Sequence, residues 1–142
     1  KLTDNYNDER FVNLPIDRLM ELMEKSVRSG HPVCWEGDIS EKGFDMESGI
    51  ATLDNENANN NDATTNAAAL RQKAFELRST TDDHCMALVG LAHDKQGKRY
   101  IIAKNSWGAI GRYHGYIFMS EQYIKMKTIA VMVKKKSVGI IV

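Results

Sequence analysis

Two strand-like runs joined by a glycine-containing turn constrain the fold of this chain more than any other feature. Met86 to Leu91 is a short apolar run, and Arg99 to Lys104 follows the turn-like Asp94-Lys95-Gln96-Gly97. Glycine supplies the positive φ that such a turn requires, so the two runs are predicted to form an antiparallel hairpin. The open end of that hairpin would bring His84, which precedes the first strand, close to Asn105, which follows the second.

Helical periodicity marks a segment near the start of the chain. Apolar side chains recur at helical spacing at Ile16, Leu19, Met20, Met23 and Val27. This spacing predicts a helix with one apolar stripe. Pro15 suits its first turn and Gly30 its C-terminal cap. A short strand over Pro32 to Trp35 is expected to follow.

The remaining segments indicate an α+β fold. Residues 54–66 are rich in Asn, Asp, Thr and Ala, which predicts a mobile surface loop. Residues 67–77 could form two or three helical turns, and residues 115–119 and 128–133 are strand-like, with a brief turn at 120–124 between them. We therefore predict a twisted antiparallel sheet packed on one helix, its last four strands forming a meander.

Length and charge limit the classes of function. A chain of 142 residues makes one domain or one lobe of a larger one, with residues 1–12 as a polar leader or linker. The 19 basic and 19 acidic residues give a net charge of +0, so no strong field favours nucleic acid or a membrane surface. No run approaches the roughly 18 apolar residues that a membrane helix needs. Nothing in the composition indicates a cellular compartment.

The chemistry of the hairpin mouth depends on His84 and Asn105. An asparagine oxygen that accepts a hydrogen bond from one imidazole N–H fixes the tautomer and leaves the other ring nitrogen facing a cleft. Trp107, two residues further on, could shield that hydrogen bond from water. This is the base-plus-orienter half of a thiol protease site. Taken alone, these residues fit a hairpin mouth without chemistry equally well.

The flanking residues resemble a known family. His84 to Gly90, Lys104-Asn105-Ser106-Trp107-Gly108 and the glycines at 111 and 115 are similar to the His and Asn motifs of papain-like cysteine peptidases. The finer resemblance is to the bleomycin hydrolase and aminopeptidase C branch. It rests on Asn13 to Asp17, Gly30 to Trp35 with Gly37-Asp38, Arg71 to Asp83, Met119 to Tyr123 and Val133 to Lys135.

The resemblance implies a fold, an activity and a role for each site residue. Residues 13–142 would be the C-terminal lobe of a papain-like peptidase domain that hydrolyses peptides, removing N-terminal residues without a cofactor. His84 would be the general base and acid, Asn105 its orienter, and Trp107 the shield. Asp83 would shape the cleft. The implied partners are a peptide substrate and a missing N-terminal lobe, and a homo-oligomer is left open.

The nucleophile that the family requires is not evident. Family members carry a Gln…Cys-Gly-Ser-Cys-Trp segment well before the histidine, and this sequence has none. Cys34-Trp35 matches only the last two residues, and 84 − 34 = 50 residues separate Cys34 from His84, against roughly 130–150 in papain-like enzymes. Cys85 adjoins His84, so on a strand its side chain points to the opposite face. We interpret both cysteines as small buried thiols that could form one disulfide.

Two other functions stay open on these residues. The first is a non-catalytic interaction module built on half a papain fold, and the second is a small thiol enzyme that uses Cys34. A metal site is not expected: His31, His93 and His114 accompany the two cysteines, but no Cys-x-x-Cys or His-Glu-x-x-His spacing is present.

Overall fold

The computed structural model describes residues 11–53 and 67–139. Residues 1–10 of the predicted leader and the whole predicted loop 54–66 lie outside the described residues. The helices are α1 (Ile16–Arg28), α3 (Ala67–Glu76), α4 (Glu121–Lys127) and α5 (Lys135–Val138). The strands are β1 (Val33–Gly37), β2 (Phe44–Asp45), β3 (Ile50–Ala51), β4 (His84–His93), β5 (Arg99–Lys104), β6 (Tyr116–Ser120) and β7 (Thr128–Met132).

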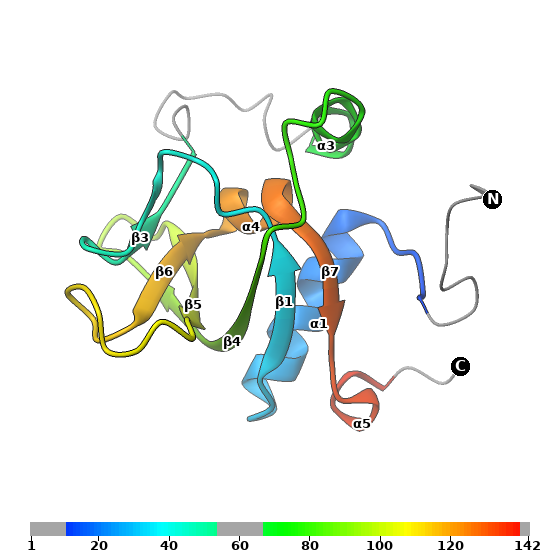
Figure 1. Ribbon diagram of the computed structural model, residues 1–142. Coiled ribbons are helices and arrows are strands. Elements are labelled where there is room, and N and C mark those ends of the chain that lie inside the picture. The colour runs from blue at the N-terminus through cyan, green and yellow to red at the C-terminus, as the bar shows by residue number, and fades with distance from the viewer. Residues whose placement is uncertain (1–10, 54–66, 140–142) are drawn as a thin grey trace.

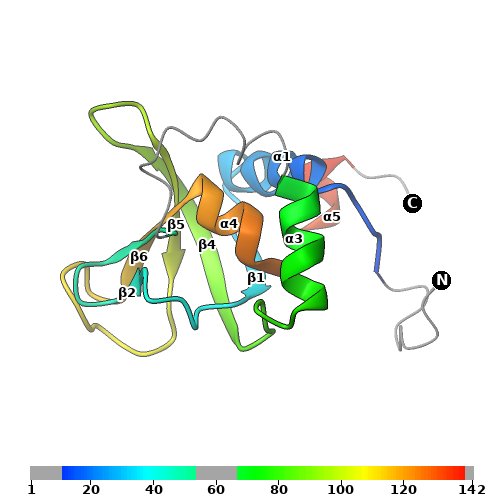
Figure 2. The same ribbon diagram turned by 90° about the horizontal axis from the view of Figure 1, so that it is seen from above.

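The strands form one seven-stranded sheet in the order β2-β3-β6-β5-β4-β1-β7. Every neighbouring pair is antiparallel except β3 and β6, which run parallel. Figure 1 shows β4, β1 and β7 side by side with α1 behind them. Seen from above, α3 stands beside α4 on the side away from the tip of the β4–β5 hairpin (Figure 2). This is the predicted α+β class, with a largely antiparallel sheet packed on α1.

The predicted hairpin of β4 and β5 is confirmed. Asp94 and Gly97 form its turn: the Gly97 N–H donates to the Asp94 carbonyl at 3.1 Å, and Gly97 has φ 85°. The Asp94 carboxylate also accepts the Lys98 N–H at 2.8 Å. These local bonds set the register from the pair His93–Arg99 to the pair Gly90–Ile102, and an irregularity between Leu88 and Gly90 then shifts it by one residue, so that Ala87 pairs with Lys104.

The predicted four-strand meander is wrong. Strands β4, β5 and β6 do follow one another, but β7 pairs with β1 at the far edge of the sheet. The cause is α4, which the sequence suggested only as a brief turn. The Ser120 hydroxyl caps this helix by accepting the Tyr123 N–H at 3.0 Å. The helix then carries the chain away from β6, so β7 cannot continue the meander.

The core lies between α1 and one face of the sheet. The predicted stripe on α1 buries Ile16, Met20 and Met23, while Leu19 and Val27 are half-buried against the core. The central strands contribute their alternate, inward-facing side chains, which include Val33, Trp35, Met86, Leu88, Ile101 and Ala103. No helix in the described part of the chain is long and apolar enough to cross a membrane.

Candidate active site

His84 and Asn105 meet at the open end of the β4–β5 hairpin. His84 is the first residue of β4, Asn105 directly follows β5, and the His84 Nε2 and Asn105 Oδ1 atoms lie 2.9 Å apart. Asn105 is only 2% exposed, whereas His84 is half-buried. The Asn105 N–H donates to the Gly115 carbonyl at 2.9 Å, which ties the site to the loop before β6. The predicted contact between imidazole and carboxamide is therefore present.

The hydrogen bonds of Asn105 assign the tautomer of His84. The Asn105 Oδ1 atom also accepts the Ser106 backbone N–H at 2.7 Å, and its Nδ2 faces the Met46 sulfur at 3.6 Å. A backbone N–H can only donate, so the atom that it meets must be the amide oxygen. The same oxygen can only accept, so His84 Nε2 carries the hydrogen. The Nδ1 atom of His84 is then left with a lone pair that can take a proton.

Trp107 covers one side of the histidine. The two ring centroids lie 4.9 Å apart, with planes tilted by 48°. Phe44 meets the edge of the Trp107 ring at 6.4 Å and supports it from β2. Trp107 nevertheless remains 49% exposed, so its outer face is open to solvent or to another part of a protein. A ring in this position can limit the access of water to the bond between His84 and Asn105 from one side, and the role of Trp107 as a shield stays a prediction.

Asp83 joins two segments and makes no described contact with the imidazole. One carboxylate oxygen of Asp83 accepts the Ile39 backbone N–H at 3.0 Å, and the other accepts the Thr81 hydroxyl at 2.9 Å. The side chain therefore links the segment that enters β4 to the segment that leaves β1. No described hydrogen bond joins this carboxylate to the His84 ring, and the role of Asp83 in shaping the cleft stays a prediction.

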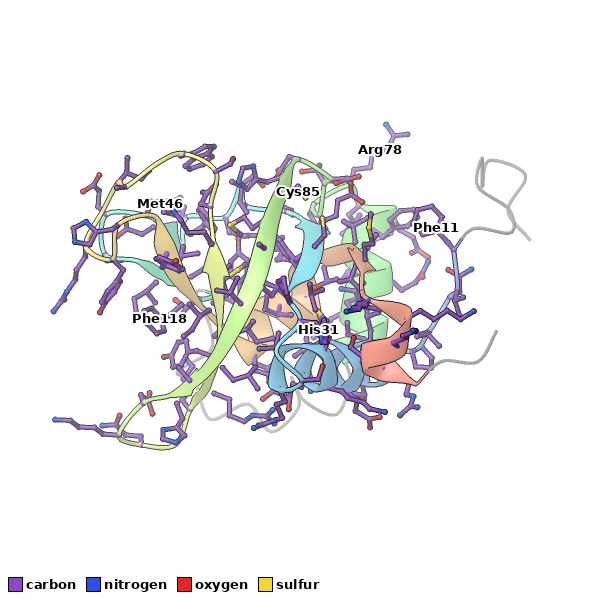
Figure 3. All side chains as sticks on the ribbon, turned by 90° about the horizontal axis from the view of Figure 1, so that it is seen from below. Phe11, His31, Met46, Arg78, Cys85 and Phe118 are labelled. Atoms are coloured by element: carbon purple, nitrogen blue, oxygen red, sulfur yellow. The ribbon has the colours of Figure 1, made fainter. Side chains whose placement is uncertain are left out.

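The prediction that both cysteines are buried is wrong. Cys34 and Cys85 are exposed free thiols whose sulfur atoms lie 3.2 Å apart. Val33 and Trp35 fill the core, so the alternation of β1 turns Cys34 to the opposite face of the sheet, away from α1. Cys85, near the beginning of β4 (Figure 3), points to that same face. His84 adjoins Cys85 and projects the other way, so neither thiol is brought to the imidazole.

The two thiols perturb one another. The hydrogen bond with Cys34, followed by partial desolvation, raises the pKa of the Cys85 thiol to about 11. A raised pKa keeps Cys85 protonated at neutral pH, which is the reverse of what a catalytic thiol needs. Among residues 11–53 and 67–139, no group of three or more His, Cys, Asp or Glu side chains could hold a metal ion.

Sequence reasoning missed several residues around the site. Met46 and Phe44 belong to the short β2–β3 region, whose two-residue strands carry no readable pattern. Asp38 and Lys127 form a buried ion pair although 89 positions separate them. A lysine in the last turn of a short helix reads as a solvated residue. Only the tertiary structure reveals this partnership.

Comparison with known proteins identifies the family. A family model described as "Peptidase C1-like family" matches residues 3–140. The chain belongs to this family. Among curated relatives, Aminopeptidase W of Lactobacillus delbrueckii subsp. lactis is 29% identical over 130 residues, which cover 90% of this chain and 29% of that protein. Aminopeptidase C of Streptococcus thermophilus is 28% identical over 130 residues, covering 89% of this chain and 28% of that protein.

A solved structure supports the same fold. The crystal structure of PepW from Lactobacillus rhamnosis HN001 superposes with a TM-score of 0.67 and 23% identity, covering 89% of this chain and 28% of that chain. This Peptidase C1-like chain thus spans less than a third of the length of the curated relatives that it matches. The predicted papain-like fold and the aminopeptidase C branch are confirmed.

Proposed function

We propose that this chain is the C-terminal lobe of a cysteine aminopeptidase and that it supplies the general base His84 and its orienter Asn105. The observation that carries the proposal is the 2.9 Å contact between His84 Nε2 and Asn105 Oδ1, with the amide turned so that His84 Nδ1 keeps a free lone pair. An imidazole prepared in this way needs only a thiol on its open side to form the proton-transfer pair of a thiol peptidase.

The chemistry assigns one task to each residue. His84 Nδ1 takes the proton of a cysteine thiol supplied by another part of the protein, and the thiolate attacks the peptide carbonyl. The resulting imidazolium donates that proton to the departing amine as the C–N bond breaks, which leaves a thioester. His84 then removes a proton from water, which hydrolyses the thioester and restores the thiol. Asn105 holds the ring throughout, and Trp107 shields their bond.

An exposed apolar surface supports the existence of a further lobe. We call it the open face; it comprises Cys34, Glu36, Cys85, Ala87, Val89, Ala130 and Met132, on the side of β4, β1 and β7 opposite the core. Glu36 is its one charged member, and Met132 is 73% exposed. A contiguous exposed apolar patch on one face of a sheet is the kind of surface that can mark an interface. We propose that the part of the peptidase that precedes this chain covers the open face.

Reconstitution tests the function. The chain is combined with the upstream cysteine-bearing lobe, and hydrolysis of a fluorogenic aminoacyl amide is followed with and without a thiol-alkylating agent. We expect thiol-dependent release of the N-terminal residue from the combined protein and none from the chain alone, because an imidazole without a nucleophile lacks most of the machinery.

Substitutions in the combined protein assign the roles. His84→Ala should abolish turnover, and Asn105→Ala should lower it less. His93→Ala, at the far end of β4, is the matched control and should leave turnover unchanged. If His84→Ala hydrolyses as fast as the wild-type protein, the assignment of the base is wrong. If the two lobes bind one another without any hydrolysis, the chain acts as an interaction module on half a papain fold.

A further inference from the structure

A buried ion pair lies under the segment that enters β4. The Lys127 Nζ atom lies 3.2 Å from Asp38 Oδ2, and the two side chains are 5% and 0% exposed. Glu41 provides a second, half-exposed carboxylate for the same ammonium group. Burying two charges is costly, and it is repaid only where further hydrogen bonds satisfy the remaining atoms of both groups. Those additional bonds show what the pair does.

The additional bonds converge on three consecutive residues. Asp38 Oδ2 accepts the Thr81 backbone N–H at 3.1 Å. Lys127 Nζ donates to the Ser79 carbonyl and to the Thr80 hydroxyl, both at 3.3 Å. Residues 79–83 belong to no helix or strand, so they have no backbone ladder of their own. The Ser79 N–H donates to the Ala74 carbonyl at 2.9 Å at one end and the Asp83 N–H to the Gly37 carbonyl at 3.4 Å at the other, and between these ends the contacts with Asp38 and Lys127 hold the segment.

Asp38 is itself held firmly. Its N–H donates to the Lys127 carbonyl at 3.1 Å, and the Tyr123 hydroxyl donates to its carbonyl at 3.0 Å. Burial alone raises the pKa of the Asp38 carboxyl, but hydrogen bonds from Ser40, Thr81 and Lys127 outweigh burial and hold the pKa below its ordinary value. Asp38 is therefore a charged acceptor at neutral pH, anchored to α4 through both its main chain and its side chain.

The pairing of β4 with β5 does not hold His84 in place. The register of β4 with β5 begins only at Ala87, so the first three residues of β4 have no partner in β5. His84 pairs on the other side with Gly37, the residue directly before Asp38. The backbone of the histidine is therefore defined by β1 and by the segment that precedes it. Both of these are attached to the Asp38–Lys127 pair.

We propose that Asp38 and Lys127 are positioning residues for His84, which hold the entry to β4 so that the imidazole meets Asn105 with its Nδ1 atom free. The juxtaposition that carries this inference is the buried pair bound to residues 79–81, next to β1, whose Gly37 pairs with His84. The expected effect of the Asp38–Lys127 pair on turnover rests on the proposed function, whereas its expected effect on the His84 ring does not.

The test removes both charges together in the 142-residue chain. Asp38→Asn with Lys127→Met leaves no uncompensated buried charge, so this double variant should fold. The matched control is Asp17→Asn with Lys125→Met, which makes the same chemical changes with the lysine on the same helix α4 and the aspartate on α1. There the ion pair, at 3.2 Å, has a largely exposed carboxylate and no contact with residues 79–83.

Two NMR readouts report on the histidine ring. Nitrogen-15 correlation spectra give the tautomer of His84, assigned by loss of its signals in His84→Gln, and solvent exchange measures protection of the Nε2 hydrogen. In the Asp38/Lys127 double variant we expect exchange to rise roughly two- to tenfold, the worth of one net hydrogen bond, together with a mixed tautomer. The control should match the wild-type chain. A merely stabilising pair would leave the ring signals of the folded chain unchanged.

The outcomes separate the two proposals. Ring signals in the Asp38/Lys127 double variant that equal those of the control overturn the positioning role, whatever the activity of the combined protein. If that variant proves unfolded, Thr80→Val removes one acceptor of Lys127 without touching a charge, and unchanged ring exchange there also overturns the role. In the combined enzyme we expect a lower kcat with little change in KM. If the Asp38/Lys127 double variant alters the ring signals while the His84→Ala protein keeps full activity, the positioning role stands and the proposed peptidase function is rejected.

Discussion

Removal of either charge from the Asp38–Lys127 pair should destabilise the chain by an amount that the structure allows us to estimate. In Asp38→Asn, the ammonium keeps Glu41, the Ser79 carbonyl and the Thr80 hydroxyl. It is therefore not left alone, and we expect a loss of about 2 kcal/mol in the free energy of unfolding. This lies below the roughly 3–5 kcal/mol seen when a buried pair loses one partner completely.

Lys127→Met should cost more. It leaves the fully buried Asp38 carboxylate without its cation, although the bonds from the Ser40 N–H at 2.8 Å, the Ser40 hydroxyl at 2.6 Å and the Thr81 N–H at 3.1 Å remain. We expect a loss of about 3 kcal/mol. Solvent does not weaken this interaction appreciably, because both side chains are at most 5% exposed.

The double variant decides whether the two charges act on one another. Two independent losses would sum to about 5 kcal/mol, but Asp38→Asn with Lys127→Met removes the isolated charge that makes each single variant costly. We therefore expect a loss of about 2–3 kcal/mol and a coupling energy of about 2–3 kcal/mol. Urea unfolding of the four proteins, followed by circular dichroism, measures this cycle. Losses that add within about 0.5 kcal/mol would refute the coupling.

Three further predictions use other features of the same structure. Because the pKa of Asp38 is lowered in the folded chain, its contribution to stability is present above about pH 4 and is lost as the pH falls. Asp38→Asn should therefore flatten the decline in unfolding free energy below pH 4, and an equal decline in the variant and the wild-type chain would contradict this. Gly37→Ala would place a methyl group 2.3 Å from the Trp35 ring and 2.4 Å from the Lys127 carbonyl, so it should lower the free energy of unfolding by about 3 kcal/mol or more. Gly30→Ala meets no atom within 4 Å and should lower it by about 1 kcal/mol, mainly because of its positive φ. Thermal melts that show equal losses of stability for the two variants would contradict this. Cys34→Ala removes the hydrogen bond that is the main cause of the raised pKa of Cys85, so alkylation of Cys85 by iodoacetamide at pH 8 should accelerate by roughly tenfold or more. An unchanged alkylation rate, measured by mass spectrometry, would show that the two thiols are not coupled.

The local parts of the fold were predictable because short-range interactions determine them. The β4–β5 hairpin follows from a turn whose hydrogen bonds all lie between Asp94 and Lys98. Antiparallel pairing about that turn brings the open ends of β4 and β5 together, and with them His84 and Asn105 across 21 positions of sequence. Helix α1 was predictable for a similar reason, since its apolar stripe repeats with the helical period. In each case the signal lies within one or two elements.

Longer-range features were not predictable. The pairing of β7 with β1 depends on where α4 directs the chain, and the parallel pairing of β3 with β6 joins segments far apart in sequence. The exposure of Cys34 was missed because an apolar strand reads as buried on both faces until the structure shows that only one face is covered. The catalytic roles of His84, Asn105, Asp83 and Trp107 stay predictions, since contact alone does not establish a reaction.

The sequence by itself determined the α+β class, the hairpin and the meeting of an imidazole with a carboxamide at its mouth, because periodicity and turn chemistry act over a few residues. Only the tertiary structure decided the strand order, the open face and the partnership of Asp38 with Lys127. These depend on which surfaces are withdrawn from water. A lysine and an aspartate 89 positions apart become partners only once the packed chain has excluded water from both.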